Sequence, residues 1–471
     1  MNGEPLNLSS SSSVHSRLSY VTSLIVVLVT LTLAEITARS MTYTLPNGLK
    51  MFRGVALLPY RPDEALVREA VKNFRTDSLL IRDPEIGWIV RPNRAASGDY
   101  TNAQGIRATP GHLYTPDPPE GKVRIVTLGD SFVYCLQVKN GETWQDYMEE
   151  IRNDVELLNL GIPGGGTDQA FLRWKRDGSR FKPQIAILGI WPGNVFRNLN
   201  IIEYYRTEVS IPLTKPRLIP ERGATDFVNF PIMSEEGLVD TLAHPERNPV
   251  LRYEFWYNSR DAALTPFRTI RLIQVAETIW RHHERQQVNR KILSGEIPDG
   301  LDVTVTIAKL FANEVRDAGA VPLVLIIPDR QRLDLGGKSF PLAARLKNAG
   351  IDVIDMGPTF GNEVKKEGPA KYYVDGVGHN SPFGNKVFAS YLERELRHGL
   401  RRQRRHRAAS GTPQWPRTST LLRSAGNSCK QLFSQHSFQH RPRSAAREGS
   451  GFNDTNSPQS TAGRDGSIGF T

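Results

Sequence analysis

Nucleophilic catalysis needs a reactive side chain at an exposed turn, and the sequence offers one at Ser131. This residue stands in Gly129-Asp130-Ser131, directly after the apolar run 123–128, which predicts a β-strand. Gly129 permits a tight strand-to-helix turn that would present the Ser131 hydroxyl and its backbone N–H at the carboxyl end of the strand. The triplet alone is common among proteins. Its position at the end of a strand is what makes Ser131 a candidate nucleophile.

A candidate general base lies near the end of the globular sequence. His379 follows Asp375 by four residues and precedes a helix predicted from Pro382. An imidazole can accept the serine proton, and a neighbouring carboxylate can fix its tautomer and stabilise the imidazolium. A lone histidine is more often structural. The assignment of His379 as base, with Asp375 as its partner, therefore depends on the fold bringing them to Ser131.

Two further segments follow predicted strands and could supply hydrogen-bond donors. The glycine-rich stretch 161–166 follows the strand 155–160, and glycines let a backbone N–H approach a ligand closely. A flexible loop or a phosphate cradle is the alternative, but the stretch does not fit GxxxxGK[ST]. Asn194 follows the strand 184–190, and its amide could donate to a developing oxyanion. An isolated Asn at such a place is more often a turn residue.

The elements that must position these residues alternate along the chain. Strands are predicted at 123–128, 155–160, 184–190, 321–327 and 351–354, and helices at 142–152, 168–178, 303–318, 342–348 and 382–396. Continuous apolar strands alternating with helices indicate a parallel sheet covered on both faces. In such sheets ligands bind beyond the carboxyl ends of the strands. The sequence therefore predicts an α/β fold with a five-stranded parallel sheet and the candidate residues at one edge.

The rest of the chain is divided by changes in composition. The predicted units are a disordered N-terminal tail 1–17, an apolar segment 18–34, a connecting region of short strands and turns 35–120, the α/β domain 121–400 with an insertion 196–300, and a disordered basic tail 401–471. The insertion is polar and aromatic, with a helix-like section at 265–288. It could form a lid or substrate wall, or a helical subdomain without a role at the site.

The formal net charge of +11 suggests nucleic-acid binding, but its distribution argues against that function. Residues 401–471 carry 12 Lys and Arg against 3 Asp and Glu, so the tail holds +9 of the total. The globular part is nearly neutral. Contact of the tail with anionic lipid or nucleic acid is less favoured than a solvated extension, and no nucleic-acid partner is expected. Metal-ligand spacings of the CxxC or HExxH kind are absent from the sequence.

The apolar segment 18–34 has three interpretations. Its seventeen residues carry no charge and are at the lower limit for crossing a hydrocarbon core about 30 Å thick. A cleaved signal peptide is the second interpretation, although Thr32-Leu33-Ala34 is a poor cleavage site. A buried globular helix is the third, and it is disfavoured because no polar face interrupts the run. A transmembrane anchor is the favoured interpretation.

Taken together, the four catalytic segments resemble the SGNH (GDSL) hydrolases, a family with a flavodoxin-like three-layer α/β/α sandwich and esterase, lipase or acyltransferase activity. The resemblance covers about residues 121–195 and 320–400. It implies Ser131 as nucleophile and His379 as base. The oxyanion donors would be the Ser131 N–H, the Gly164 N–H and the Asn194 amide.

Two positions depart from the family pattern. Val195 stands where the family's third block has Asp, and this change is expected to affect the stability of the loop more than the chemistry. Asp375 precedes His379 by four residues, whereas the family spacing is three. A one-residue bulge could preserve the hydrogen bond, or the site could work as a Ser–His dyad.

The resemblance implies a function as well as a site. A serine esterase or acyltransferase would act on an ester substrate, with acylated cell-surface polysaccharide as a candidate, and would require no metal or organic cofactor. The apolar segment followed by the stretch 84–88 (PEIGW) resembles bacterial members that are membrane-anchored with the catalytic domain facing outward; secretion after signal cleavage is the alternative. A catalytically silent domain that binds glycans or assembles a surface complex is the competing function.

Overall fold

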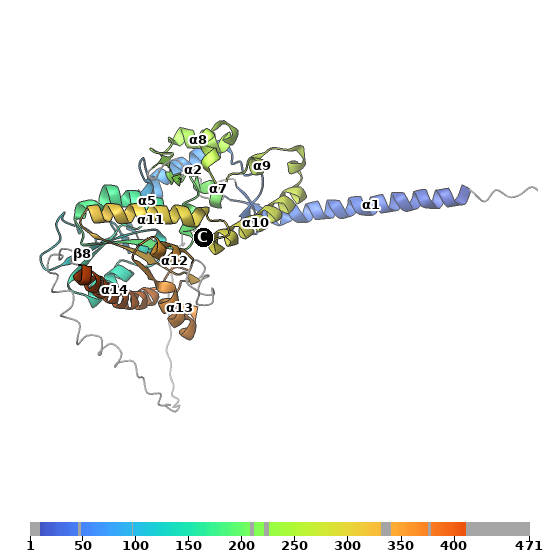
Figure 1. Cartoon of the computed structure of the whole chain (residues 1–471). Helices are drawn as coiled ribbons and strands as arrows, with labels where there is room; N and C mark the ends of the chain where they lie inside the picture. Colours follow the sequence, from blue (N-terminus) through green and yellow to red (C-terminus); the bar gives the residue numbers. More distant parts are fainter. Residues whose placement is uncertain are drawn as a thin grey trace, which may run out of the picture.

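A parallel sheet of five strands, with helices on both faces, forms the centre of the molecule (Figure 1). The computed structural model describes residues 10–45, 49–96, 98–207, 212–220, 226–330, 341–374 and 378–410. The strands are β8 Val123–Leu128, β9 Val155–Asn159, β10 Ile185–Ile190, β13 Val321–Ile326 and β14 Val353–Asp355. Each lies close to the apolar run that predicted it. The α/β fold class and the five-stranded parallel sheet are therefore confirmed.

The strand order puts the candidate nucleophile after an inner strand, next to the point where the order of the strands reverses. The order is β14-β13-β10-β8-β9, and every neighbouring pair is parallel. This is the flavodoxin-like order, in which the chain moves to one side after the first strand and then back across the sheet. The order reverses between β8 and β10, and ligands bind beyond the carboxyl ends of the strands at such a point. Ser131 follows β8 and so lies at this reversal.

Successive side chains of each strand point to opposite faces of the sheet. Val126 and Leu188 pack into an apolar layer with α5 and α11, whereas Ile125 and Ile187 pack into a second layer with α4 and α14. The covering helices are α4 Trp144–Ile151, α5 Thr167–Arg173, α11 Asp299–Asp317, α12 Pro341–Asn348, α13 Met356–Glu367 and α14 Pro382–Ser410. The predicted three-layer sandwich is thus confirmed. Helix α13 is an addition that the sequence analysis did not assign.

The connecting region contains the short strands that were expected and one helix that was not. The strands are β1 Thr42–Thr44, β2 Lys50–Phe52, β3 Val55–Ala56, β4 Leu80–Asp83, β5 Gly87–Val90, β6 Ala95–Ala96 and β7 Asp99–Tyr100. The unexpected helix is α2 (Glu64–Asp77). Asp63 caps it by accepting from the N–H groups of Ala65 and Leu66. Buried Val67 and Val71 lie one turn apart on its inner face. The many charged residues of this stretch make that apolar spacing hard to recognise in the sequence, so no helix was predicted there.

The insertion is mainly helical and shares the core of the sheet domain. Its elements are α6 Asn194–Arg197, α7 Glu203–Thr207, β11 Arg217–Leu218, β12 Phe227–Val228, α8 Glu235–Ala243, α9 Ser259–Ala262, α10 Arg271–Ser294 and 3-10 turns at Pro245–Arg247, Pro249–Tyr253 and Pro266–Thr269. Tyr204, Leu238 and Trp256 belong to the same buried cluster as α5 and α11. The Lys215 ammonium forms a fully buried ion pair with the Asp168 carboxylate of α5. The insertion is therefore built into the domain.

The first helix, α1 (Ser10–Ser40), projects from the domain (Figure 1). It begins before the apolar run, so residues 10–17, which the sequence analysis assigned to a disordered tail, are helical because the apolar helix extends through the serine run. Within the described residues, Ser19–Ser40 is long and apolar enough to cross a membrane by length and composition. At the other end α14, predicted at 382–396, continues to Ser410, ten residues past the predicted end of the α/β domain at residue 400. The rest of the predicted basic tail, 411–471, lies outside the described residues.

The buried Lys215–Asp168 pair predicts a measurable loss of stability. We expect Lys215→Met to lower the free energy of unfolding by about 3–5 kcal/mol, because it leaves the Asp168 carboxylate buried without its partner. The double variant Lys215→Met/Asp168→Leu removes both charges and should recover most of that loss. Denaturant unfolding of the full chain in detergent measures both values. Equal stability of wild type and Lys215→Met would contradict this account of the pair.

Candidate active site

The turn after β8 presents Ser131 as the first residue of a short helix, α3 (Ser131–Tyr134). Gly129 allows the close packing that this turn requires: its φ is +155°, and a Cβ atom there would lie 2.6 Å from the Gly189 carbonyl oxygen. Asp130 caps the helix by accepting from the Phe132 N–H at 2.9 Å. These constraints place the Ser131 hydroxyl at the carboxyl edge of the sheet, as the sequence predicts.

His379 reaches the same place from the opposite end of the domain. Its Nε2 atom lies 2.8 Å from Ser131 Oγ, although the two residues are 248 positions apart in the sequence. Both residues are 3% exposed, and the Phe132 ring packs on the imidazole with centroids 4.6 Å apart. This distance allows the imidazole to take the hydroxyl proton directly. The structure thus brings the expected nucleophile and base into contact.

A residue that the sequence analysis did not single out binds the other ring nitrogen. Gln137 Oε1 lies 3.1 Å from His379 Nδ1. An amide oxygen only accepts, so Nδ1 carries the hydrogen and Nε2 presents its lone pair to Ser131. Asp375 lies outside the described residues, and its place in the triad stays a prediction. Gln137 follows α3 in a left-handed backbone conformation (φ +78°), which no sequence motif indicates.

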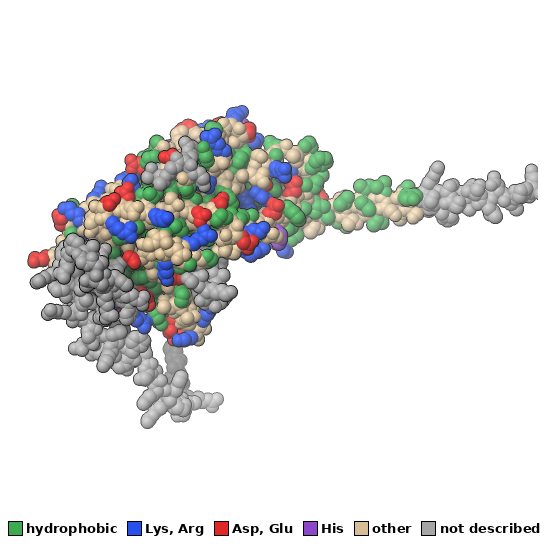
Figure 2. Space-filling view, in the orientation of Figure 1, with side chains coloured by type: hydrophobic (Ala, Val, Ile, Leu, Met, Phe, Trp, Pro, Cys, Tyr) green, Lys and Arg blue, Asp and Glu red, His purple; other side chains and the backbone are tan. Residues whose placement is uncertain are grey.

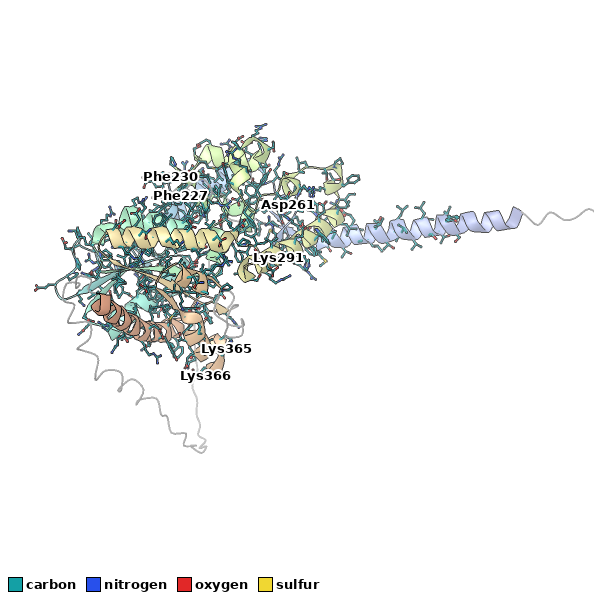
Figure 3. All side chains as sticks on the ribbon, in the orientation of Figure 1. Phe227, Phe230, Asp261, Lys291, Lys365 and Lys366 are labelled. Atoms are coloured by element: carbon teal, nitrogen blue, oxygen red, sulfur yellow. The ribbon has the colours of Figure 1, made fainter. Side chains whose placement is uncertain are left out.

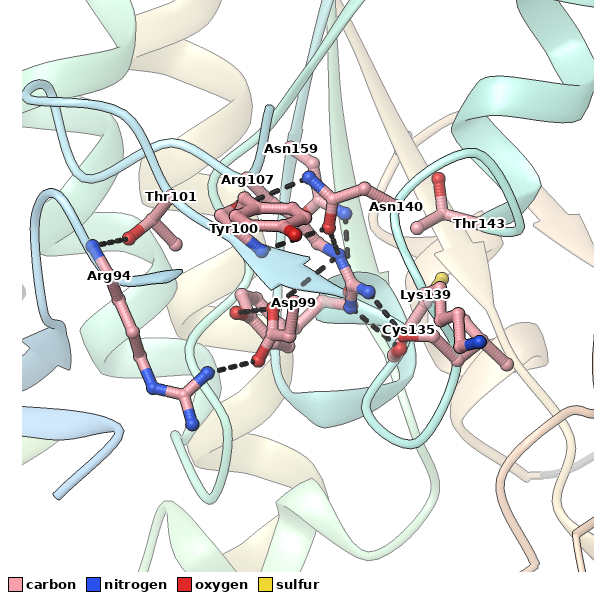
Figure 4. Close-up of polar contacts among 12 residues, drawn as sticks. Arg94, Asp99, Tyr100, Thr101, Arg107, Cys135, Lys139, Asn140, Thr143 and Asn159 are labelled. Carbon is pink, nitrogen blue, oxygen red and sulfur yellow. Dashed lines mark hydrogen bonds and ion pairs between the residues drawn. The ribbon is translucent and has the colours of Figure 1, made fainter. Parts of the chain in front are cut away.

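The loop that carries Gln137 is held by the connecting region (Figure 4). The Arg107 guanidinium, which is buried, donates to the carbonyl oxygens of Tyr134 at 2.7 Å and Cys135 at 2.8 Å, and also to that of Val138. These carbonyls lie where α3 ends, and a buried carbonyl without a donor is costly. Asn140 Oδ1 accepts from Arg107 Nε at 3.0 Å. Residues 35–120 therefore help to position the site.

Two of the backbone N–H groups expected to bind an oxyanion, those of Ser131 and Gly164, have no backbone acceptor in the part of the chain that the structure describes. Within the described residues, neither the Ser131 nor the Gly164 N–H donates a backbone hydrogen bond. The neighbouring Gly165 and Gly166 N–H groups do have acceptors, at Ile162 O and Gln169 Oε1, so Gly164 alone of these three glycines keeps its N–H available.

A buried tryptophan fixes the direction of that N–H. Trp88 Nε1 donates to the Pro163 carbonyl at 3.0 Å. The N–H of a trans peptide points away from its carbonyl, so this bond turns the Gly164 N–H to the opposite side. Trp88 belongs to the PEIGW stretch, and this contact gives that stretch a role in the geometry of the site.

Asn194 has a different arrangement from the one expected of a free oxyanion donor. Its Nδ2 donates to Asp130 Oδ2 at 3.0 Å and to the Gly165 carbonyl at 3.1 Å, so both amide hydrogens have protein acceptors. Arg197 Nη1 donates to the same Asp130 oxygen at 2.8 Å. In this state Asn194 ties two loops together, and it would have to release one acceptor to donate to an oxyanion. Val195, where the family has Asp, is fully buried in the apolar core.

An aromatic wall stands beside the dyad. The Trp191 ring stacks on Phe132 with centroids 5.5 Å apart, and the Arg197 guanidinium lies over the Trp191 ring at 4.9 Å. Trp191 Nε1 donates to Asp329 Oδ2 at 2.5 Å, which fixes the plane of the indole. Asp329 follows β13, so residues after β8, β10 and β13 all contribute to the surroundings of Ser131.

The surroundings of His379 keep the imidazole neutral. Burial and, to a smaller extent, the positive charge of Arg197 together lower its pKa from 6.5 to about 4. A neutral imidazole is the form that accepts a proton. For Asp130, burial raises the pKa of the carboxyl, and the Arg197 guanidinium and the hydrogen bonds from Phe132 and Asn194 oppose that shift.

Comparison with known proteins gave structural similarities only. No protein-family model matches the chain, and no curated protein sequence matches it. A lipolytic protein of the G-D-S-L family from Desulfitobacterium hafniense DCB-2 is similar with a TM-score of 0.31 and 11% identity, over 58% of this chain and 99% of that one. Axe2, an acetylxylan esterase from Geobacillus stearothermophilus, is similar with a TM-score of 0.32 and 14% identity, over 59% and 95% of the two chains. The acetyl xylan esterase AlAXEase gives 0.30 and 11%, over 57% and 98%.

The lowered pKa of His379 predicts that kcat/KM falls at a lower pH than is usual for a histidine base. Since His379 must be unprotonated to act as base, we expect kcat/KM on a small ester to stay high as the pH falls and to drop only through about pH 4. The pH dependence of kcat/KM, measured in the full chain together with a check that the fold persists, tests this. An acid limb at the ordinary histidine value of 6.5 would show that the imidazole is not desolvated as described.

The contact between Gln137 and His379 predicts that a substitution of Gln137 shifts the acid limb of the kcat/KM profile. Gln137→Glu puts a carboxylate at Nδ1, which favours the imidazolium and should raise the pKa of His379, so the acid limb moves to higher pH. Gln137→Ala should lower kcat about tenfold to a hundredfold with little change in KM, because the tautomer is no longer fixed. A role in folding alone would leave the pH profile of the Glu variant unchanged.

Proposed function

We propose that this protein is a serine esterase or acyltransferase of the SGNH type. The observation that carries the proposal is the 2.8 Å contact between Ser131 Oγ and His379 Nε2 at the switch point of a flavodoxin-like sheet. Two backbone N–H groups with no backbone acceptor in the described residues, those of Ser131 and Gly164, support it.

Acyl transfer on this site proceeds in two steps. Ser131 Oγ attacks the ester carbonyl carbon while His379 Nε2 takes the hydroxyl proton, and the oxyanion is stabilised by the N–H groups of Ser131 and Gly164. Collapse of the tetrahedral intermediate breaks the bond to the alcohol, which leaves with the proton from His379. Water, or an acceptor hydroxyl in a transferase, then gives its proton to His379 and attacks the acyl-enzyme. As the second tetrahedral intermediate collapses, the bond between Ser131 Oγ and the acyl carbon breaks and His379 returns its proton to Oγ, which restores the Ser131 hydroxyl.

The proposed substrate is an acylated carbohydrate, with acetyl as the acyl group. This assignment follows from the resemblance of the four sequence segments to the family. The flat aromatic rings of buried Phe132 and half-buried Trp191, stacked on each other next to the dyad, are compatible with it. The competing function is a silent domain that binds glycans without turning them over.

We also propose that α1 is retained as a membrane anchor, with the catalytic domain outside the cytoplasm. Residues at the end of α1 belong to the folded domain: the Glu35 carboxylate accepts from the N–H groups of Arg271 at 3.0 Å and Leu272 at 2.7 Å. Ala38 is buried in a cluster with Leu57 and Val275. Signal cleavage before Glu35 would remove most of α1 and leave only residues 35–40, the end of the helix that contacts the domain. This short end would then lack the preceding helical turns that continue it.

Hydrolysis of a chromogenic ester tests the enzymatic proposal. We expect the full chain in detergent to hydrolyse p-nitrophenyl acetate and Ser131→Ala to lose at least about a thousandfold in kcat. Ser131→Ala changes one buried oxygen atom, so its unfolding midpoint should stay close to that of the wild type. Equal turnover by the two proteins, both folded, would favour the silent glycan-binding domain.

A further inference from the structure

Most exposed hydrophobic side chains outside α1 come from segments near the C-terminal end of this helix, residues 35–40. Outside α1, ten large hydrophobic residues are exposed in the described part of the chain, and seven of them come from the segments 41–43 and 264–280. The seven are Met41, Tyr43, Leu264, Phe267, Ile270, Ile279 and Trp280. Figure 2 shows hydrophobic side chains on the domain where α1 leaves it. An apolar patch of this kind marks a surface that is covered by something other than water.

The segment before α10 exposes apolar side chains and buries a charged one. Pro266–Thr269 is a 3-10 turn, and residues three apart in such a turn lie on the same side. Phe267 lies in this turn, and Leu264 and Ile270 flank it three residues before and three after; we call these three residues the ridge. Leu264 and Phe267 are each 69% exposed. The charged residue between them, Arg268, points inward instead: it is mostly buried and pairs with Glu277 at 2.7 Å. Apolar residues outside and charge inside is the reverse of the usual surface pattern.

This surface is fixed relative to α1. The two hydrogen bonds from Glu35 hold the start of α10 against the end of α1, and Asp261 binds Arg281 at 2.6 Å to join α9 to α10. Figure 3 shows Asp261 on the side of the molecule from which α1 projects, with Phe230 well away from it. A membrane crossed by α1 would therefore meet the 264–270 ridge in a set orientation.

Exposed positive side chains lie on α1, on β2 and the turn after it, and on α9, elements that neighbour α10 or the segment before it. Arg39, Lys50, Arg53 and Arg260 are all exposed and come from the end of α1, from β2 and the turn after it, and from α9. Aromatic and aliphatic residues next to lysine and arginine are typical of the interface between lipid headgroups and acyl chains, where the rings enter the boundary and the cations meet anionic headgroups.

We propose that the ridge Leu264, Phe267 and Ile270 inserts into the headgroup region of an anionic lipid bilayer and docks the domain on the membrane surface beside its anchor. This inference rests on the proposed anchoring by α1. It means that the catalytic domain does not swing freely on a tether. The sheet edge that carries Ser131 is then held at a fixed height and angle above the membrane, which limits the esters that it can reach.

Three single-tryptophan additions test the proposal in the full chain, reconstituted in phosphatidylcholine–phosphatidylglycerol vesicles with or without brominated acyl chains. Phe267→Trp probes the ridge, and Phe230→Trp is the matched control because Phe230 is also an exposed phenylalanine (50%) but lies away from α1. Leu28→Trp reports on the insertion of α1 itself. The emission added by each probe is obtained by subtracting the spectrum of the parent chain.

We expect the brominated lipid to quench the added emission of Leu28→Trp and Phe267→Trp and to leave that of Phe230→Trp unchanged. Quenching at Leu28→Trp with none at Phe267→Trp would overturn the docking and leave the anchor intact. No quenching at Leu28→Trp would instead contradict the anchor on which the inference rests. Replacing Leu264, Phe267 and Ile270 together by Ser should abolish protection of the 264–270 backbone from hydrogen exchange by vesicles, without changing turnover of a soluble ester.

Discussion

One buried carboxylate joins the three loops from which the candidate site is built. Asp130, which follows β8, accepts from the Phe132 N–H of its own turn and from Asn194 and Arg197, which follow β10. Asn194 and Arg197 also donate to the Gly165 carbonyl, which follows β9. The loops after three neighbouring strands are therefore tied at one point. Without that tie, the Ser131 and Gly164 N–H groups would not be held in a constant relation to each other or to His379.

Much of the fold and part of the site could be predicted from local patterns. The five apolar strands gave the sheet, and Gly129, Ser131, Gly164 and His379 were placed at its edge because the carboxyl ends of parallel strands meet there. Each of these residues is marked by a short segment that lies directly beside a strand or helix. The structure puts Ser131 and His379 in contact.

The remaining parts of the site depend on contacts between distant residues. Gln137 faces His379 because Arg107, thirty residues earlier, pins the loop after α3, and neither residue lies in a motif. Trp88 orients the Gly164 N–H by donating to the carbonyl of Pro163, the residue before Gly164. Asn194 was expected to point at an oxyanion, but its amide is held by Asp130 and Gly165. Sequence spacing does not contain such information, since it arises only when the connecting region folds onto the sheet domain.

The same tight packing defines the chemistry that the site would support, because burial keeps His379 neutral and the parallel sheet aligns it with Ser131. The most direct test of this account is the mass of the full chain after rapid mixing with p-nitrophenyl acetate and acid quenching, followed by peptide mapping. The account predicts one acetyl group on the peptide that contains Ser131, and none on that peptide in Ser131→Ala. Turnover without an acetylated Ser131, or an acetyl group that persists in Ser131→Ala at equal yield, would contradict it.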